Sequence, residues 1–255
     1  MGSLNLKKIL AIVEGQKSDY RLMNHLLKMF YKDEFYVWPY CTNLYELYNT
    51  FQLCDREDFE SVDTLLAIKA REHDPDKLVR LNEKYTDIIL IFDLDPQDPQ
   101  YSPQKIQKMK NIFNESTDNG KLYINYPMVE AFKHLKAEVD KEYIHRMVSI
   151  DDLVNKRYKS IVDRDTYQSN FEMYGKLQCL QNMKQNLQKT NFIINGVYEL
   201  PNDVNDYEII DFSILVNIQV KLLAAESQFY VLCTCILFLL DYSPSYFLKQ
   251  LHELY

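Results

Sequence analysis

Short apolar runs separate helical patterns in the first half of the chain. The runs 8–13 (KILAIV) and 87–92 (DIILIF) are apolar almost throughout, which is typical of strands buried on both faces of a parallel sheet. The run 35–40 (FYVWPY) is also strand-like, with Pro39 marking its end or a sheet edge. Residues 121–126 (KLYINY) alternate as a half-buried strand does. The pattern therefore predicts strands at these four places.

Helical spacing fills the segments between these runs. Residues 18–32 place an apolar stripe on one helix face, formed by Leu22, Leu26, Leu27 and Phe30. Ser102-Pro103 opens another helix, and Pro127 a further one that carries Met128, Val129, Phe132 and Leu135. The order of strands and helices predicts an α/β fold with a mainly parallel sheet flanked by helices.

A helical insertion is expected at about 43–85, between the second and third strands. Asn43 would cap its first helix and Ser61 its second. Asp74-Pro75 supplies an N-cap and first position for the third.

After about residue 145 the strand patterns fade and helices are predicted. Their expected ranges are 151–158, 167–189, 206–225, 226–242 and 243–254. The apolar run 229–240 is shorter than the roughly 20 residues of a membrane-spanning helix, and we expect a buried helix there. The sequence thus suggests an α/β domain at 1–145 and a helical region at 146–255.

Composition narrows the class of protein. With 47% hydrophobic and 26% charged residues, the chain is long enough for a substantial core. Its five cysteines include no C-x-x-C, and its five histidines include no H-E-x-x-H, so disulfide frameworks and common zinc sites are not indicated. No charged-then-apolar leader opens the chain, so we expect a cytoplasmic protein without membrane contacts.

The net charge of −8 opposes binding that relies on broad phosphate neutralisation. Any nucleic-acid contact must therefore be local. Two basic tracts are candidates, residues 105–110 (KIQKMK) and the group Lys156, Arg157 and Lys159, although a solvated helix face is the more common role of such runs.

Acidic residues follow two of the predicted strands. Glu14 comes directly after the first strand, and Asp93 and Asp95 follow the strand at 87–92. Ligands of open parallel sheets bind outside the carboxyl ends of the strands, so these three carboxylates are expected to converge. Mg²⁺ or Mn²⁺ would relieve their mutual repulsion, because hard cations prefer oxygen ligands. The structural alternatives are a helix N-terminal acid for Glu14 and a capped turn for the aspartates; Asp98 is expected to be a solvated loop acid.

Three sequence elements resemble the Toprim family. Residues 13–19 (VEGQKSD) are similar to the V-E-G-x-[KT]-[ST]-[DE] opening of Toprim domains, and 92–95 (FDLD) to the Toprim D-x-D. Residues 125–132 (NYPMVEAF) resemble the N-P-x-x-E element of RloB-like proteins, although Tyr126 separates the Asn from the Pro. The resemblance covers roughly residues 8–140 and extends to the OLD-family and AriB-like nucleases of phage defence.

The resemblance implies roles for individual residues. Glu14 would be a metal ligand or general base, Asp93 and Asp95 metal ligands, and Glu130 the acid of a second metal site. Lys17, at a helix N-terminus, is a candidate for holding the scissile phosphate; a solvated lysine is the alternative. Gly15-Gln16-Lys17-Ser18 lacks the first glycine of a P-loop, so ATP hydrolysis by this chain alone is not expected.

The resulting expectation is a Mg²⁺- or Mn²⁺-dependent endonuclease that cuts DNA or RNA, tRNA among the candidate substrates, in anti-phage defence. The resemblance implies an ATPase partner protein, and a homo-oligomer is compatible with the sequence. Two alternatives stay open: a Toprim-like binding or sensor subunit without catalysis, and a D-x-D phosphatase in which Asp93 is the nucleophile and Asp95 the acid/base.

Overall fold

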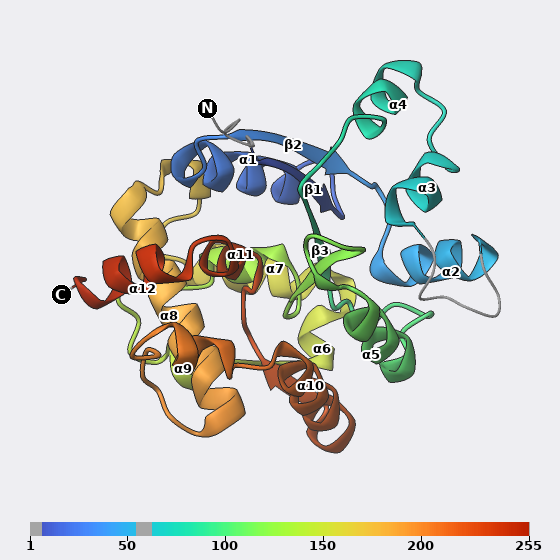
Figure 1. Cartoon of the computed structure of the whole chain (residues 1–255). Helices are drawn as coiled ribbons and strands as arrows, with labels where there is room; N and C mark the ends of the chain where they lie inside the picture. Colours follow the sequence, from blue (N-terminus) through green and yellow to red (C-terminus); the bar gives the residue numbers. More distant parts are fainter. Residues whose placement is uncertain (1–6, 55–62, 255) are drawn as a thin grey trace, which may run out of the picture. The chain divides into compact units, whose positions relative to one another are not determined.

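The computed structural model describes residues 7–54 and 63–254 (Figure 1). The chain divides into two compact units. The first comprises Met1–Phe92 and Gln104–Leu122, and the second Asp93–Pro103 and Tyr123–Tyr255. Residues 123–145, which the sequence groups with the N-terminal half, thus pack with the C-terminal helices.

A five-stranded, mostly parallel sheet of order β2-β1-β3-β5-β4 organises the first unit. Strand β1 pairs in parallel with both β2 and β3, which confirms the predicted α/β class with a mainly parallel sheet. All four predicted strands are present, and Pro39 lies on an edge strand as expected. The short strand β4 was not predicted; it pairs antiparallel with β5. The strands are β1 Lys8–Val13, β2 Glu34–Pro39, β3 Asp87–Asp93, β4 Asn114–Glu115 and β5 Gly120–Asn125.

Helix α1 (Ser18–Phe30) lies along β1 and β2 and buries its predicted apolar stripe (Figure 1). The predicted insertion contains α2 (Leu44–Cys54), α3 (Thr64–Lys69) and α4 (Pro75–Leu81). Its outer caps are confirmed, because Asn43 accepts from the Glu46 N–H at 2.9 Å and Asp74 from the Asp76 N–H at 3.0 Å. Asp63 caps α3, and the predicted cap Ser61 lies outside the described residues. Helix α5 (Pro103–Ile112) follows β3.

The second unit is mainly helical, with several short 3-10 turns. Its helices are α6 Ile150–Leu153, α7 Arg157–Asp165, α8 Lys176–Asn195, α9 Val204–Glu208, α10 Phe212–Glu226, α11 Phe238–Tyr242 and α12 Pro244–His252. Its 3-10 turns are η2 Val129–Lys133, η3 Tyr143–His145, η4 Val154–Lys156, η5 Phe171–Met173 and η6 Cys235–Leu237.

Several predicted helices of this unit are wrong. The segment 151–158 is interrupted at Asn155, which has a left-handed backbone (φ 57°), and 206–225 is divided into α9 and α10. The segment 226–242 is not one helix, because Ser227 adopts a left-handed backbone (φ 55°) that ends α10. The following residues form strand β7 (Gln228–Tyr230), which pairs antiparallel with β6 (Met147–Ser149). The helix predicted from Pro127 is only the five-residue turn η2, and the helix predicted from residue 167 begins at Lys176.

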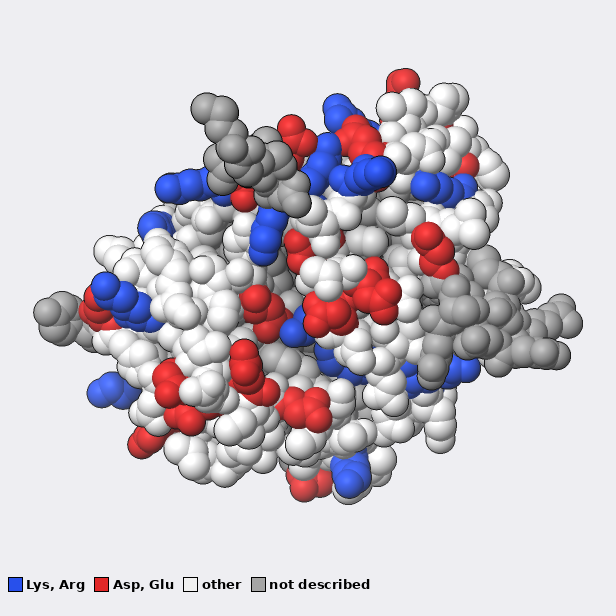
Figure 2. All heavy atoms as spheres, in the orientation of Figure 1, with Lys and Arg blue, Asp and Glu red and all other residues white. Residues whose placement is uncertain are grey.

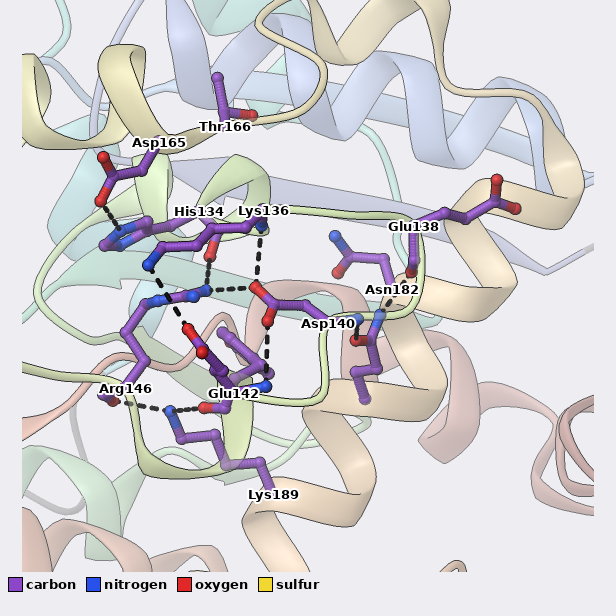
Figure 3. Close-up of polar contacts among 12 residues, drawn as sticks. His134, Lys136, Glu138, Asp140, Glu142, Arg146, Asp165, Thr166, Asn182 and Lys189 are labelled. Atoms are coloured by element: carbon purple, nitrogen blue, oxygen red, sulfur yellow. Dashed lines mark hydrogen bonds and ion pairs between the residues drawn. The ribbon is translucent and has the colours of Figure 1, made fainter.

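Helix α8 carries polar side chains on its buried face, and these hydrogen-bond an irregular segment at 132–146 (Figure 3). The Asn182 amide donates to the Phe132 carbonyl at 2.6 Å, and Gln185 donates to the Glu138 carbonyl at 2.9 Å. The Lys189 ammonium, fully buried, donates to the carbonyls of Tyr143 and Arg146 at 2.7 and 2.8 Å. Buried backbone groups need hydrogen-bond partners. The side chains of α8 therefore supply hydrogen bonds that neighbouring backbone groups would supply in a regular helix or sheet.

A buried ion pair lies within the same network. The Arg146 guanidinium contacts the Asp140 carboxylate at 2.7 Å and also donates to the His134 carbonyl at 2.7 Å. Burial alone would raise the pKa of Asp140, but the Lys136 backbone N–H and Arg146 together hold it below its usual value. Burial and the neighbouring Arg146 charge lower the pKa of Lys189 well below its usual value.

We expect Lys189→Met to destabilise the fold by roughly 1–3 kcal/mol, because the buried carbonyls of Tyr143 and Arg146 each lose one of their two hydrogen-bond donors. Urea unfolding followed by circular dichroism measures this change in the free energy of unfolding. Lys221→Met, at an exposed position on α10, is the matched control and should change stability by less than about 0.5 kcal/mol. Equal stabilities of the two variants would contradict the role given to Lys189.

Burial, helped by the Arg146 charge, lowers the pKa of His134 to about 3, so its 4.0 Å contact with Asp165 is not an ion pair at neutral pH. The unfolded chain binds this proton near pH 6.5 whereas the native chain does not. His134 should therefore lower the free energy of unfolding as pH falls from about 6.5 to 3, by up to about 1.4 kcal/mol per pH unit. Urea unfolding at pH 7, 6, 5 and 4 should show that the free energy of unfolding falls more steeply with pH in the wild type than in His134→Gln. Parallel plots of this free energy against pH for the two proteins would refute the prediction.

Candidate functional site

Glu14 lies at the carboxyl end of β1, as predicted. Its backbone N–H donates to the Ile91 carbonyl of β3 at 3.0 Å, and its carbonyl accepts from the Cys41 N–H at 2.9 Å. The backbone of Glu14 is therefore fixed between the ends of the two strands that flank β1. The parallel register, in which Val13 is opposite Ile91, produces this arrangement.

The turn after Glu14 passes close to the first turn of α1. A Cβ atom built on Gly15 would lie 2.6 Å from the Asp19 carboxylate, which is buried in the first turn of α1. Gly15 and Asp19 of the VEGQKSD element thus belong to one packing unit. Lys17 precedes α1, is exposed, and its side chain makes no capping hydrogen bond. Its role in phosphate binding stays a prediction.

The D-x-D segment is tied to the residues that follow β5. The Leu94 N–H donates to the carbonyls of Asn125 (3.0 Å) and Pro127 (3.1 Å), and the Asp95 N–H donates to Pro127 at 3.4 Å. Asp95 adopts a left-handed backbone with φ 39°, which an aspartate tolerates better than most residues. The chain thus turns sharply after β3 and stays against the segment 125–127.

Asn125 holds the buried Asp93 side chain. Its amide donates to Asp93 Oδ1 at 3.4 Å, a long hydrogen bond. Its own oxygen accepts from the Cys235 N–H at 3.2 Å and from Cys233 Sγ at 3.6 Å, so the amide N–H groups must face Asp93. Asn125 was not among the predicted site residues. Its only signal in the sequence is its place at the start of the NYPMVE element.

Burial raises the pKa of Asp95, and neighbouring charges modify it. The Gln97 side chain donates to Asp95 at 3.0 Å, and this hydrogen bond lowers the pKa of Asp95, as does the Lys159 charge. The negative charges of Asp98 and Glu130 raise the pKa of Asp95. The Asp98 carboxylate accepts from the Gln100 N–H at 2.7 Å and so orders the loop. Asp98 therefore stabilises its own turn, and its negative charge raises the pKa of Asp95.

Glu130 is nine-tenths buried although it lies on a short 3-10 turn. Its Oε1 is 3.0 Å from Lys159 Nζ, and its side chain is 10% exposed. Its Oε2 is buried and has no hydrogen-bond partner among the described residues. Lys159 comes from α7, and the sequence had marked it only as part of a basic run. A buried carboxylate oxygen without a partner is costly, which makes this position a candidate for ligand binding.

The predicted site residues are divided between the two units. Glu14 and Lys17 belong to the first, whereas Asp93, Asp95 and Glu130 belong to the second. The predicted convergence of all of them therefore stays a prediction. Within residues 7–54 and 63–254, no group of three or more His, Cys, Asp or Glu side chains is arranged so that it could hold a metal ion. The metal assignment likewise stays a prediction, supported by the oxygen-only chemistry of these side chains.

The basic tract on α5 is used in packing. Lys110 is buried and donates to the Leu122 carbonyl at 3.0 Å, and Lys105 lies over the Tyr48 ring, 5.3 Å from its centre. On the face drawn in Figure 2, the described Lys and Arg side chains are interspersed with acidic ones. Two of the three lysines in this tract thus make contacts within the first unit.

Comparisons with protein-family models, with curated proteins and with solved structures give no match. A search of the described helices finds none with the length and apolar character needed to span a bilayer.

Asp95→Asn should raise the free energy of unfolding at pH 7. Burial raises the pKa of Asp95, so its ionised form destabilises the native state, and this penalty grows as pH rises through the folded pKa. Asparagine removes the charge and suits a left-handed backbone. Urea unfolding at pH 7 and pH 4 should show a gain that is larger at pH 7. A loss of stability at pH 7 would contradict the prediction.

Proposed function

We propose that the chain is a metal-dependent nuclease of the Toprim type that hydrolyses phosphodiester bonds in DNA or RNA. The observation that carries the proposal is a group of acidic residues in the second unit, Asp93, Asp95 and Glu130, called the acidic centre below. A buried carboxylate oxygen of Glu130 lacks a partner, and the Glu130 charge acts on Asp95 of the D-x-D turn. Natural proteins accept such unfavourable arrangements mainly where function requires them.

Asp93, Asp95 and Glu130 carry the carboxylate oxygens that Mg²⁺ and Mn²⁺ prefer, and a cation would have to draw them together, since the described residues hold no ready-made group of three. When bound, such a cation would supply charge stabilisation and an activated water. Asp93, held by Asn125, and Asp95, held in a fixed turn, would be its ligands. Glu130 would complete the set from η2. Glu14 and Lys17 belong to the first unit, and their roles as metal ligand and phosphate contact stay predictions.

The biological setting is proposed from the resemblance alone. An effector nuclease of anti-phage defence would be activated by an ATPase partner, and the chain itself lacks a P-loop. Its net charge of −8 fits substrate contact through a small area or through the partner.

Asp93→Ala should reduce divalent-dependent cleavage by at least about a hundredfold, because metal-held charge stabilisation contributes several kcal/mol. The assay uses plasmid, single-stranded DNA and tRNA with Mg²⁺ or Mn²⁺, with and without the product of the neighbouring gene. Asp151→Ala, at an exposed position on α6, is the control and should cleave as the wild type does.

Circular dichroism must show that Asp93→Ala is folded; Asp93→Asn provides an isosteric check. Cleavage by both Asp93 variants at the wild-type rate would remove Asp93 from the mechanism. Metal binding without cleavage of any substrate would favour the binding or sensor alternative.

A further inference from the structure

Helix α10 carries apolar side chains on both of its faces. Of the 15 residues from Phe212 to Glu226, only Lys221 and Glu226 are charged. One face packs on α8 and β7 of the same unit (Figure 1). Its buried residues are Leu215, Val216, Gln219 and Val220. A helix that is apolar all round is usually covered on every side, so the other face of α10 is a candidate for contact with a partner.

The Gln219 side chain fixes the rotation of α10 about its own axis. It is fully buried, its amide nitrogen donates to the Tyr230 carbonyl at 2.9 Å, and its oxygen accepts from the Tyr230 N–H at 3.0 Å. Both polar groups of the side chain thus pair with one residue of β7, as a neighbouring strand would. The face of α10 opposite Gln219, called the outer face below, is therefore held away from β7.

The outer face combines apolar side chains with one acid and one base. Helical periodicity brings together a group of residues there, none of which is buried. They are Asp211, Ile214, Ile218, Lys221, Leu222 and Ala225. Ile214 is 43% exposed, and Ile209, just before the helix, is 70% exposed. Single exposed apolar residues are common, but a continuous row of them indicates an interaction surface.

The residues of the outer face are arranged symmetrically about the level of Val216 along the helix. Asp211 lies five residues before this level and Lys221 five residues after it. Ile214 and Ile218 lie two residues before and after it. An identical helix placed antiparallel, about a two-fold axis at this level, would bring its Asp211 opposite Lys221. The same axis would bring its Ile218 opposite Ile214, so the outer face is complementary to itself.

The two charged side chains of the outer face are available for such a contact. Within residues 7–54 and 63–254, neither Asp211 nor Lys221 forms an ion pair. Asp211 caps α10 by accepting from the Ser213 N–H at 2.7 Å, which keeps its carboxylate at the start of the helix. A foreign apolar partner would cover the isoleucines without needing an acid and a base at matching positions. The charge pattern therefore favours a second copy of this chain.

We propose that the outer face of α10 is the interface of a symmetric dimer, in which two copies of the chain pack these helices antiparallel. The proposal is independent of the nuclease function. Antiparallel packing also places the positive end of each helix dipole beside the negative end of the other. One pair of helices of this length buries less surface than a standard protein interface, so the expected Kd is micromolar, about 1–50 µM.

Sedimentation equilibrium of the full chain, from about 1 to 200 µM, measures this association. Ile218→Glu should raise the Kd at least about a hundredfold, because each copy would bury an unpaired carboxylate beside the two-fold axis. Leu177→Glu is the matched control: it puts the same charge at a 66% exposed leucine on α8 and should leave the Kd unchanged. Circular dichroism checks that both variants are folded. If Ile218→Glu is not, Ile214→Ser replaces it, with a smaller expected loss of about tenfold.

Charge variants test the antiparallel register. Lys221→Glu places carboxylates opposite each other and should raise the Kd about tenfold. Lys221→Met loses only an exposed ion pair and keeps the apolar contact, so its Kd should change less than about threefold. Adding Asp211→Asn to Lys221→Glu removes the repulsion while asparagine keeps the helix cap. This double variant should recover most of the lost affinity.

Three results would overturn the proposal. A wild-type chain that stays monomeric up to about 200 µM has no dimer of the expected strength. A dimer with the same Kd in folded Ile218→Glu is held by another surface. A dimer that needs Ile218 but is not weakened by Lys221→Glu has a different register from the two-fold one proposed.

Discussion

The second unit depends on hydrogen bonds from the side chains of α8 to the backbone at 132–146. This segment has only short 3-10 turns, so side chains of α8 supply some of the hydrogen bonds that a helix or sheet would otherwise provide. Asn182, Gln185 and Lys189 bind it at successive turns of one face of α8. An apolar helix face would leave these groups unsatisfied, which explains why a long helix buries so many amide and amine side chains.

The acidic centre inherits its geometry from this arrangement. Asn182 anchors the carbonyl of Phe132, two residues after Glu130, so η2 is fixed at its own end. At the other end, Asn125 is held by the backbone and thiol of a C-terminal segment at 233–235 and in turn holds Asp93. Three separate parts of the chain thus position carboxylates that repel one another. Burial is the main reason why the pKa of Asp95 is raised, and the charges of Asp98 and Glu130 add to it.

Three basic side chains of this protein are committed to internal contacts. Lys189 and Lys110 are buried and donate to backbone carbonyls, and Arg146 neutralises Asp140 inside the second unit. These three groups are not available to a phosphate backbone. Lys159 differs, since it is half-exposed and stands among carboxylates. Its position gives the acidic centre a cation of its own.

The sequence by itself determined the first unit well, because its strands are uninterrupted apolar runs and its helices carry local caps such as Asn43 and Asp74. It also marked Asp93, Asp95 and Glu130 as unusual acids. It did not reveal the pairing of β6 with β7, the collapse of the expected helix after Pro127 into η2, or the partners Asn125 and Lys159. These features rest on contacts between residues far apart in the chain, where long-range hydrogen bonds and ion pairs override local helix spacing. Only the tertiary structure decided them.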